Sequence, residues 1–433
     1  MTDPLTESVQ PEPGPVAFRD LDPRVHRIFV GFAFSALGSG LTMPFLFVYL
    51  AEVRDFPTST VGLVFAWMGL LGFVTAPIGG TLIDKVGPRP VMIFGLLVEA
   101  AAAATLGHIE TVTQGVVIAS LIVVGTVGLY PASTAMLTRL VPPSTRERVY
   151  GINFMLMNAG IGLGGAISAL IIDVDSVESF QRLYYLDGLS FLVYVAVLVS
   201  LPKGTGALPV PDEGPLEEQV DQPSWRVVLA DRTLLRVAAI SVLVITFGYA
   251  QMETGVAAYA TQVADVPAKA LGWAWTANTV AIVLGQLLTL KFIQGRRRSA
   301  MLALCAATWA VSWLVIASCN VVDGWVAIAS VVLGLAIFGW GETLWAPVAP
   351  AIVNDLARED ARGRYNALQG MVWTVASIIG PASAGLLIGH GLTTVWVGCV
   401  VGGTALAGVL FLDLRRHLTP QQDGLAAAPA AVA

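Results

Sequence analysis

Long apolar runs dominate this chain of 433 residues and constrain its fold more than any other feature. A helix needs roughly 20 mostly apolar residues to cross the hydrocarbon core of a bilayer. Twelve such runs occur, six before and six after a break that follows residue 201: near 27–51, 61–84, 90–107, 114–139, 149–172, 183–201, 234–262, 270–293, 300–319, 325–353, 363–388 and 393–413. Only 12% of the residues are charged. We therefore predict an all-α membrane protein with twelve transmembrane helices.

The basic residues predict how these helices are oriented. Short cytoplasmic loops of membrane proteins are enriched in Lys and Arg. If the amino terminus is cytoplasmic, only Arg54, Arg182 and Lys269 of the 24 basic residues fall in outer loops. This asymmetry predicts that both termini are cytoplasmic. The excess of Arg over Lys, beside much Ala and Gly, favours a bacterial source, so we expect a multi-pass protein of the bacterial cytoplasmic (inner) membrane.

A polar segment divides the chain into two parts. The stretch "PKGTGALPVPDEGPLEEQVDQP" is rich in Pro, Gly and acidic residues and has no apolar periodicity, so it predicts a flexible cytoplasmic linker. The predicted parts are a cytoplasmic amino-terminal segment (1–25), a six-helix bundle (26–201), the linker (202–232), a second six-helix bundle (233–415) and a disordered cytoplasmic tail (416–433).

The two bundles have similar sequences. "DPRVHRI" at 22–28 returns loosely as "DRTLLRV" at 231–237, and a shift of 216 positions pairs Gly125 with Gly341. A repeat of six helices keeps its orientation in the membrane. The sequence therefore predicts two parallel halves related by an axis along the membrane normal.

The segment "GGTLIDKVGPRP" at 79–90 places charges between two apolar runs. Before it, Gly72, Ala76, Gly80 and Asp84 follow one another at steps of four, which puts small residues and then a carboxylate on one helix face. Such a face can approach another helix closely. The alternative is an ordinary charged loop that only fixes the topology.

This segment resembles the signature G-x-x-x-D-[RK]-x-G-x-[RK] between helices 2 and 3 of the major facilitator superfamily. The matching residues are Gly80, Asp84, Lys85, Gly87 and Arg89. The twelve helices, the linker and the parallel halves are also similar to that family, from about residue 25 to 415. The resemblance implies a transporter whose halves rock, and a conformational latch in which Arg139, at the end of helix 4, is a partner for Asp84. The second-half counterpart "FIQGRRRS" has Phe292 where the acid would fall, so only one latch is predicted to be complete.

Two glycine-rich stretches predict close helix packing. In "NAGIGLGGAIS" at 158–168, Gly160 and Gly164 share a helix face and Gly165 lies beside them. The stretch resembles the antiporter motif of the same family, with Gly165 in place of its proline, and Gly380 with Pro381 in helix 11 is a better match. "YLDGLSF" at 185–191 resembles the start of helix 6 in bacterial drug and macrolide exporters. The resemblance favours export, although import stays open.

Ionisable residues deep in a membrane are costly and are functional candidates by default. Glu99, Glu253 and Glu342 fall inside predicted helices. Burial of a carboxyl group favours its protonated form, so each of the three is a candidate for proton coupling. The resemblance implies a cavity lined by helices 1, 4, 7 and 10, which favours Glu253 and Glu342. The alternative is a structural pairing, and we expect Asp187 only to cap or pack.

Polar and aromatic side chains predict the lining of a substrate cavity. The selected residues are Tyr130, Tyr249, Asn278, Trp345, Gln369 and Trp373. Rings and a carboxylate together suit apolar or cationic organic molecules. Packing between helices is the alternative for each of them. Pro347 and Pro350 predict a hinge in helix 10.

Other kinds of chemistry have no support in the sequence. No phosphate-binding G-x-x-x-x-G-K-[ST] loop and no zinc spacing among the histidines occur, and the three cysteines lie in apolar runs. We expect no enzyme activity, no cofactor, no metal and no nucleic-acid partner. The predicted function is proton-coupled efflux of small amphipathic compounds or drugs by a monomer among membrane lipids. The alternatives are a specific proton-coupled metabolite exporter or nutrient importer, and a non-transporting receptor or scaffold.

Overall fold

The computed structural model describes residues 18–126, 128–142, 145–205, 225–357 and 362–425. Helices are the regular structure throughout these ranges, and they contain no strand. Most of the predicted linker and parts of both predicted terminal segments lie outside the described residues.

The amino-terminal half is built from six crossing segments, of which the first and the fourth are interrupted. In chain order its helices are η1 (Phe18–Asp20), α1 (Pro23–Thr42), η2 (Met43–Phe45), α2 (Leu46–Val48), η3 (Tyr49–Val53), α3 (Thr58–Val86), α4 (Pro88–Leu106), α5 (Val112–Thr126), α6 (Leu129–Thr138), α7 (Arg146–Ile171) and α8 (Val177–Ser200). The first crossing segment consists of α1, η2, α2 and η3, and the fourth of α5 and α6.

The carboxy-terminal half repeats this plan. Its helices are α9 (Trp225–Ala230), α10 (Arg232–Phe247), η5 (Tyr249–Gln251), α11 (Gly255–Ala258), η6 (Tyr259–Val263), α12 (Lys269–Ile293), α13 (Arg298–Ala317), η7 (Ser318–Asn320), α14 (Gly324–Leu356), α15 (Arg362–Gly389) and α16 (Thr393–Leu414). Eleven segments of the described chain are long and apolar enough to cross a membrane. The 25-residue helix α12, which packs against α7 and α14, is the further helix that the predicted twelve require. The prediction of a helical membrane protein is confirmed.

Equivalent residues of the two halves have the same local structure. Asp22 caps α1 by accepting a hydrogen bond from the Arg24 amide, and Asp231 caps α10 by accepting from two amides. At the other ends of these segments, η3 and η6 are both π-helical turns. Asp55 and Asp265 follow them with positive φ angles of 54° and 49°, a conformation uncommon for residues other than glycine. The halves are therefore copies in backbone detail as well as in helix order.

The halves touch closely at the end where η3 and η6 lie, which we name the far end. A Cβ atom added to Gly62 of α3 would lie 2.6 Å from the carbonyl oxygen of Pro381 in α15. One added to Gly272 of α12 would lie 2.4 Å from the carbonyl oxygen of Gly165 in α7. Only glycine permits backbones to approach this closely. Two glycine-dependent contacts thus close the far end.

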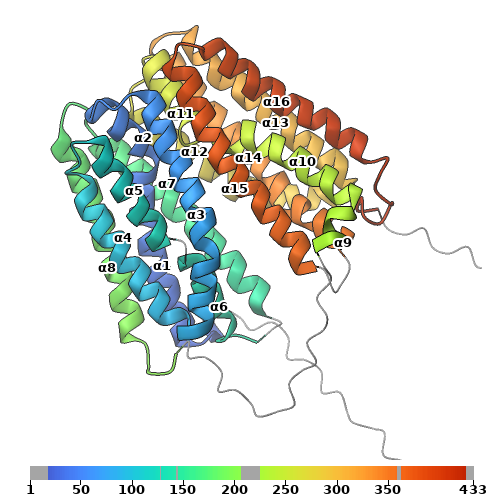
Figure 1. The fold of residues 1–433 in the computed structure, drawn as a ribbon, viewed down its shortest axis with the longest axis horizontal. Helices are drawn as coiled ribbons and strands as arrows, with labels where there is room; N and C mark the ends of the chain where they lie inside the picture. Colours follow the sequence, from blue (N-terminus) through green and yellow to red (C-terminus); the bar gives the residue numbers. More distant parts are fainter. Residues whose placement is uncertain (1–17, 127, 143–144, 206–224, 358–361, 426–433) are drawn as a thin grey trace, which may run out of the picture.

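The halves separate toward the opposite end, at which α1 begins and which we name the terminal end. Contact between α3 and α15 extends as far as Gly69 and Ser377. Closer to the terminal end, Gly80 of α3, Gly370 of α15 and Gly151 of α7 have no atom within 4 Å of an added Cβ. The halves meet near α2 and α11 and stand apart near α6 and α9 (Figure 1). The molecule is closed at the far end and open at the terminal end.

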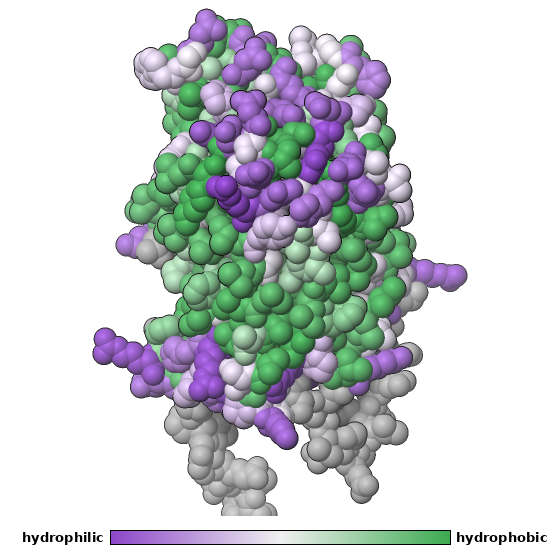
Figure 2. Space-filling view, turned by 90° about the vertical axis from the view of Figure 1, so that its left-hand side faces the viewer, coloured by the Kyte–Doolittle hydropathy of each residue, from purple (hydrophilic) through white to green (hydrophobic). Residues whose placement is uncertain are grey.

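The surface matches a protein that lies in a bilayer. Figure 2 shows apolar side chains over the middle of the molecule and polar side chains gathered at both ends. Arg54, Arg182 and Lys269 belong to the far end, as expected from the sequence. A lipid-facing belt explains why so many large apolar side chains are exposed.

The residues directly after α16 differ from the predicted disordered tail. Asp423 is fully buried, accepts a hydrogen bond of 2.8 Å from the Ser299 amide and pairs with Arg297 at 3.1 Å. Arg298 pairs with Asp355 at the end of α14. A carboxylate at the start of α13 satisfies free amides and is favoured by the helix dipole. The described part of the tail therefore packs a carboxylate against the basic start of α13.

Closure of the far end should depend on Gly62. Gly62→Leu should force α3 and α15 apart and raise the rate at which a membrane-impermeant maleimide labels Ser59→Cys, by about tenfold or more. Gly80→Leu, on the same helix but with no neighbour, should not raise it. Equal labelling rates in both variants would show that this contact does not close the far end.

Candidate functional site

The seventh crossing segment is interrupted at the middle of the carboxy-terminal half. Its first helix, α10, ends at Phe247, and η5 and α11 follow after Gly248, whose φ and ψ angles are −95° and −87°. A Cβ on Gly248 would lie 2.6 Å from the Trp309 ring, so packing requires glycine there. Irregular backbone at membrane depth is tolerated where it is buried in protein or lines a cavity. The interruption is largely buried in protein, since Thr246, Gln251 and Thr254 are at most 3% exposed, whereas Tyr249 and Glu253 are half-buried.

The sequence predicted a hinge in α14, whereas the structure interrupts a different segment. We expected a hinge at Pro347 and Pro350, yet α14 continues through both of them. Neighbouring helices support it, because α12 and α13 both pack along α14. Proline is tolerated inside transmembrane helices where such neighbours compensate the lost hydrogen bonds.

Glu342 is the most firmly positioned of the predicted carboxyl groups. It lies half-buried on α14 and accepts a hydrogen bond of 2.9 Å from Nδ2 of Asn278 on α12. Asn278 is 4% exposed and also donates to the Leu335 carbonyl at 3.2 Å. Gly339 lets the two helices approach, since an added Cβ there would lie 2.5 Å from the Asn278 carbonyl oxygen. The amide group thus fixes the orientation of the carboxylate.

Tyr249 connects Glu342 with Glu253. Tyr249 and Glu253 both lie on the interrupted stretch between α10 and α11. The Tyr249 hydroxyl interacts with the Glu342 carboxylate and also with the charge of Glu253. No ion pair to either glutamate exists in the described part of the chain. The structure therefore brings two predicted carboxyl groups from separate segments to one phenol.

Aromatic rings form one wall beside these acids. The ring of Trp373 on α15 meets Tyr249 edge-on, with centroids 4.9 Å apart. Both rings are half-buried. Aromatic faces and a carboxylate in a dry setting attract organic cations. This cluster, made of Tyr249, Glu253, Asn278, Glu342 and Trp373, is the candidate site.

The other predicted cavity residues lie elsewhere. Trp345 is 7% exposed and packs against Trp309 and Phe411 inside the half. Gln369 is half-buried one helical turn before Trp373. Tyr130, on α6 of the other half, is 62% exposed. Glu99 is also in the other half and is not part of this cluster.

Two residues of the predicted latch, Asp84 and Lys85, are exposed in this conformation. The Asp84 side chain is exposed and makes no hydrogen bond or ion pair with any residue the structure describes. Lys85 is likewise exposed. Arg89 instead donates to the carbonyls of Val199, Leu201 and Pro202 at 3.0 to 3.2 Å, which caps the end of α8. Gly87 has a positive φ of 87°, and Arg139 lies at the end of α6.

The glycine motifs contact the interrupted segments. A Cβ on Gly160 would lie 2.6 Å from the Ala36 Cβ, and one on Gly164 would lie 2.4 Å from the Leu37 carbonyl oxygen of α1. In the other half, a Cβ on Gly380 would lie 2.5 Å from the Ala250 Cβ of η5. Each motif therefore holds a long helix against the segment that is interrupted in its own half.

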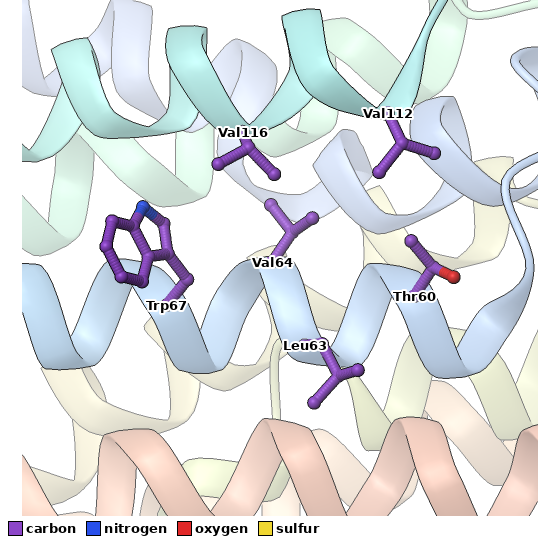
Figure 3. A pocket seen from close by; sticks show the side chains of 6 residues that line it. All are labelled: Thr60, Leu63, Val64, Trp67, Val112 and Val116. Atoms are coloured by element: carbon purple, nitrogen blue, oxygen red, sulfur yellow. The ribbon is translucent and has the colours of Figure 1, made fainter.

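An apolar hollow on the outer surface is unrelated to this site. It has a volume of about 270 Å³ and lies between α3 and α5, lined by Thr60, Leu63, Val64, Trp67, Val112 and Val116 (Figure 3). None of these side chains is charged, so the hollow offers no counter-charge to a proton or a cation.

Comparison with known proteins gives one consistent family. The Major Facilitator Superfamily profile matches residues 28–270 and again 262–433. The chain is 25% identical over 403 residues to the uncharacterized MFS-type transporter YqjV of Bacillus subtilis, covering 91% of this chain and 94% of YqjV. It is 25% identical over 389 residues to the quinolone resistance protein NorA of Staphylococcus aureus, covering 88% and 93%.

Solved structures agree on the fold. A crystal structure of the peptide transporter POT superimposes with a TM-score of 0.75 at 16% identity, covering 95% of this chain and 97% of that one. At this identity the likeness shows the fold alone.

Asp84 should matter for conformational change rather than for ligand contact. Asp84→Asn should leave the affinity of the purified protein for tetraphenylphosphonium within about twofold, because the side chain is far from the candidate site. Its turnover in transport should fall about tenfold, because without the Asp84 carboxylate the predicted latch cannot stabilise the opposite conformation. Asp175→Asn, an exposed acid at the far end, is the matched control. Unchanged turnover with normal expression would exclude a latch at Asp84.

Proposed function

This chain belongs to the Major Facilitator Superfamily of transporters, and we propose that it exports small amphipathic compounds, organic cations among them, in exchange for protons. The observation that carries the proposal is the half-buried Glu342, which accepts a hydrogen bond of 2.9 Å from Asn278, lies against Tyr249 of the interrupted seventh segment and has no basic partner among the described residues. Glu253 and Glu342 are both half-buried, and the half-buried Trp373 packs edge-on against Tyr249.

Competition between a proton and an organic cation for one carboxyl group would couple proton entry to substrate export. A carboxylate removed from water costs several kcal/mol unless it is protonated or paired with a cation. Glu342 has hydrogen-bond partners but no basic partner among the described residues. Either a proton or an organic cation neutralises it, and the arrival of one favours the release of the other. Glu253 is the second candidate for the same role.

The conformation fits loading from the cytoplasm. With the basic residues assigned to the cytoplasm, the open terminal end faces inward and the closed far end faces outward. Rocking the halves would break the glycine contacts that close the far end and bring Asp84 of α3 toward the start of α15. One chain contains both halves of this path, so we propose that the monomer transports.

The relatives support export over other uses of the fold. NorA is named for quinolone resistance, and a multidrug resistance protein of Aeromonas salmonicida, MdtH, is 24% identical over 358 residues. The antiporter-like stretches around Gly164 and Pro381 support the same direction. We also propose that the protein lies in the bacterial cytoplasmic membrane.

Transport can be tested in inverted membrane vesicles with an acidic lumen and a fluorescent pH probe. Several unrelated lipophilic cations should dissipate the gradient in wild type, and Glu342→Gln should reduce this rate at least about tenfold, because an amide cannot exchange a proton. Glu253→Gln should also lower it. Glu178→Gln, an exposed acid on α8, should behave as wild type.

The same assay separates the alternatives. A response to one nutrient or metabolite alone would indicate a narrow transporter. Silence across cations, antibiotics and nutrients, with folded protein in the membrane, would contradict proton-coupled transport. A full rate in Glu342→Gln would make Glu342 structural.

A further inference from the structure

A second pair of carboxyl groups is buried in the amino-terminal half. Glu99 of α4 is 7% exposed and Asp187 of α8 is 6% exposed. The two helices pack side by side, and a Cβ on Gly188 would lie 3.2 Å from the Ala100 carbonyl oxygen. The carboxyl groups also interact electrostatically. The structure therefore brings together two acids that are 88 positions apart in the chain.

Each acid is bonded to a threonine at the end of a helix. The Thr42 hydroxyl, on the last residue of α1, donates to Oδ2 of Asp187 at 2.9 Å. The Thr126 hydroxyl, on the last residue of α5, donates to Glu99. Thr42 therefore lies where the first crossing segment is interrupted, and Thr126 is the last residue of α5 in the fourth. A carboxyl pair on the scaffold helices α4 and α8 thus holds the interruptions of two other segments.

One oxygen of the pair lacks a partner. Oδ1 of Asp187 is buried and makes no hydrogen bond with any described residue. It faces α1, because a Cβ on Gly38 would lie 2.6 Å from it. A buried polar atom without a partner is costly and marks a place where a ligand or a proton is missing.

The surrounding elements supply no positive charge to the pair. Their titratable side chains are Arg24, His26 and Arg27 of α1, Tyr49, Glu52 and Arg54 beyond it, Asp84 and Lys85 of α3, Arg89 of α4, Tyr130 of α6, and Glu178, Arg182, Tyr184, Tyr185 and Tyr194 of α8. None of these basic residues forms an ion pair with Glu99 or Asp187 in the described ranges. The Arg54 guanidinium instead donates to the Tyr49 hydroxyl and the Gly107 carbonyl. Tyr184, whose hydroxyl is also buried and unpartnered, interacts with Asp187.

We propose that Glu99 and Asp187 form a proton-binding site that α1 and α5 sense through Thr42 and Thr126. Two neighbouring carboxyl groups in an apolar setting are costly to ionise together, so a proton bound here would stabilise the described conformation. Loss of that proton leaves a buried, charged oxygen beside Gly38 with no basic partner among the described residues. The charge then favours a conformation in which α1 moves and water reaches the pair. The use of a proton gradient by this site rests on the proposed efflux. Proton binding by the two carboxyl groups does not depend on that proposal.

The test measures conformation instead of transport. Purified full-length protein carries spin labels at Leu82→Cys and Ala367→Cys, on facing helices of the two halves, in a Cys399→Ser background. Pulsed electron paramagnetic resonance then records the distance between the labels from about pH 5 to about pH 9, without substrate. In the otherwise wild-type protein, the population with a separated terminal end should fall at least about twofold as the pH rises.

Three variants and one control decide the outcome. Asp187→Asn and Glu99→Gln should each reduce the shift several-fold, since an amide does not titrate. Thr42→Val should also reduce it, because the link to α1 is lost. Glu178→Gln, on the same helix as Asp187, should keep the full shift. If one of the two carboxyl variants does not fold, the other still tests whether the pH-dependent shift requires this pair.

Two results would overturn the inference: no pH-dependent shift in wild type, or an undiminished shift in both carboxyl variants. The proposed efflux fails separately. If no compound moves protons in vesicles while the distance shift still requires Asp187, the proton site stands and the export proposal does not.

Discussion

Burial of carboxyl groups without basic partners is the constraint on which the rest of this structure depends. Glu99, Asp187, Glu253 and Glu342 lie within apolar segments, and no described Lys or Arg pairs with them. Such groups stay neutral or acquire a cation, since an ionised carboxylate is costly in a bilayer. Each is placed beside an interrupted crossing segment. Their protonation is therefore tied to the backbone that has to move.

The glycine contacts determine how that movement is confined. At the far end, Gly62 and Gly272 let helices of opposite halves meet backbone to backbone. Toward the terminal end the same helices diverge, and Asp84 is unpaired. The described glycines are thus in close contact across the halves at the far end and free of neighbours nearer the terminal end, which is the asymmetry that the proposed rocking requires.

Much of the fold was predictable from the apolar runs, because a bilayer leaves few alternatives to a full-length helix. The parallel repeat and the glycine motifs were visible in the same way. The interruption at Gly248 was not, since one glycine inside a continuous apolar run gives no local signal, whereas the prolines of α14 gave a misleading one. The burial of Asp423 against α13 was not predictable, because it depends on a contact between segments far apart in the chain.

The candidate site was predictable only in part. Single acids in apolar runs identify Glu253 and Glu342 directly, and their shared contact with Tyr249 depends on tertiary structure. Trp345 has the right composition for a cavity, yet neighbouring rings bury it. Asp187 was expected to pack because it lies near a predicted helix end. Its proposed role in proton binding depends on its position near Glu99, which lies on a different helix.

The most direct test of the account is whether a bound cation displaces a proton from Glu342. Tetraphenylphosphonium would be added to purified protein in weakly buffered solution, and the released protons would be counted with a pH indicator. The account predicts release of about one proton per bound cation in wild type, and release close to zero in Glu342→Gln. Saturable binding by wild type with no proton release would contradict it.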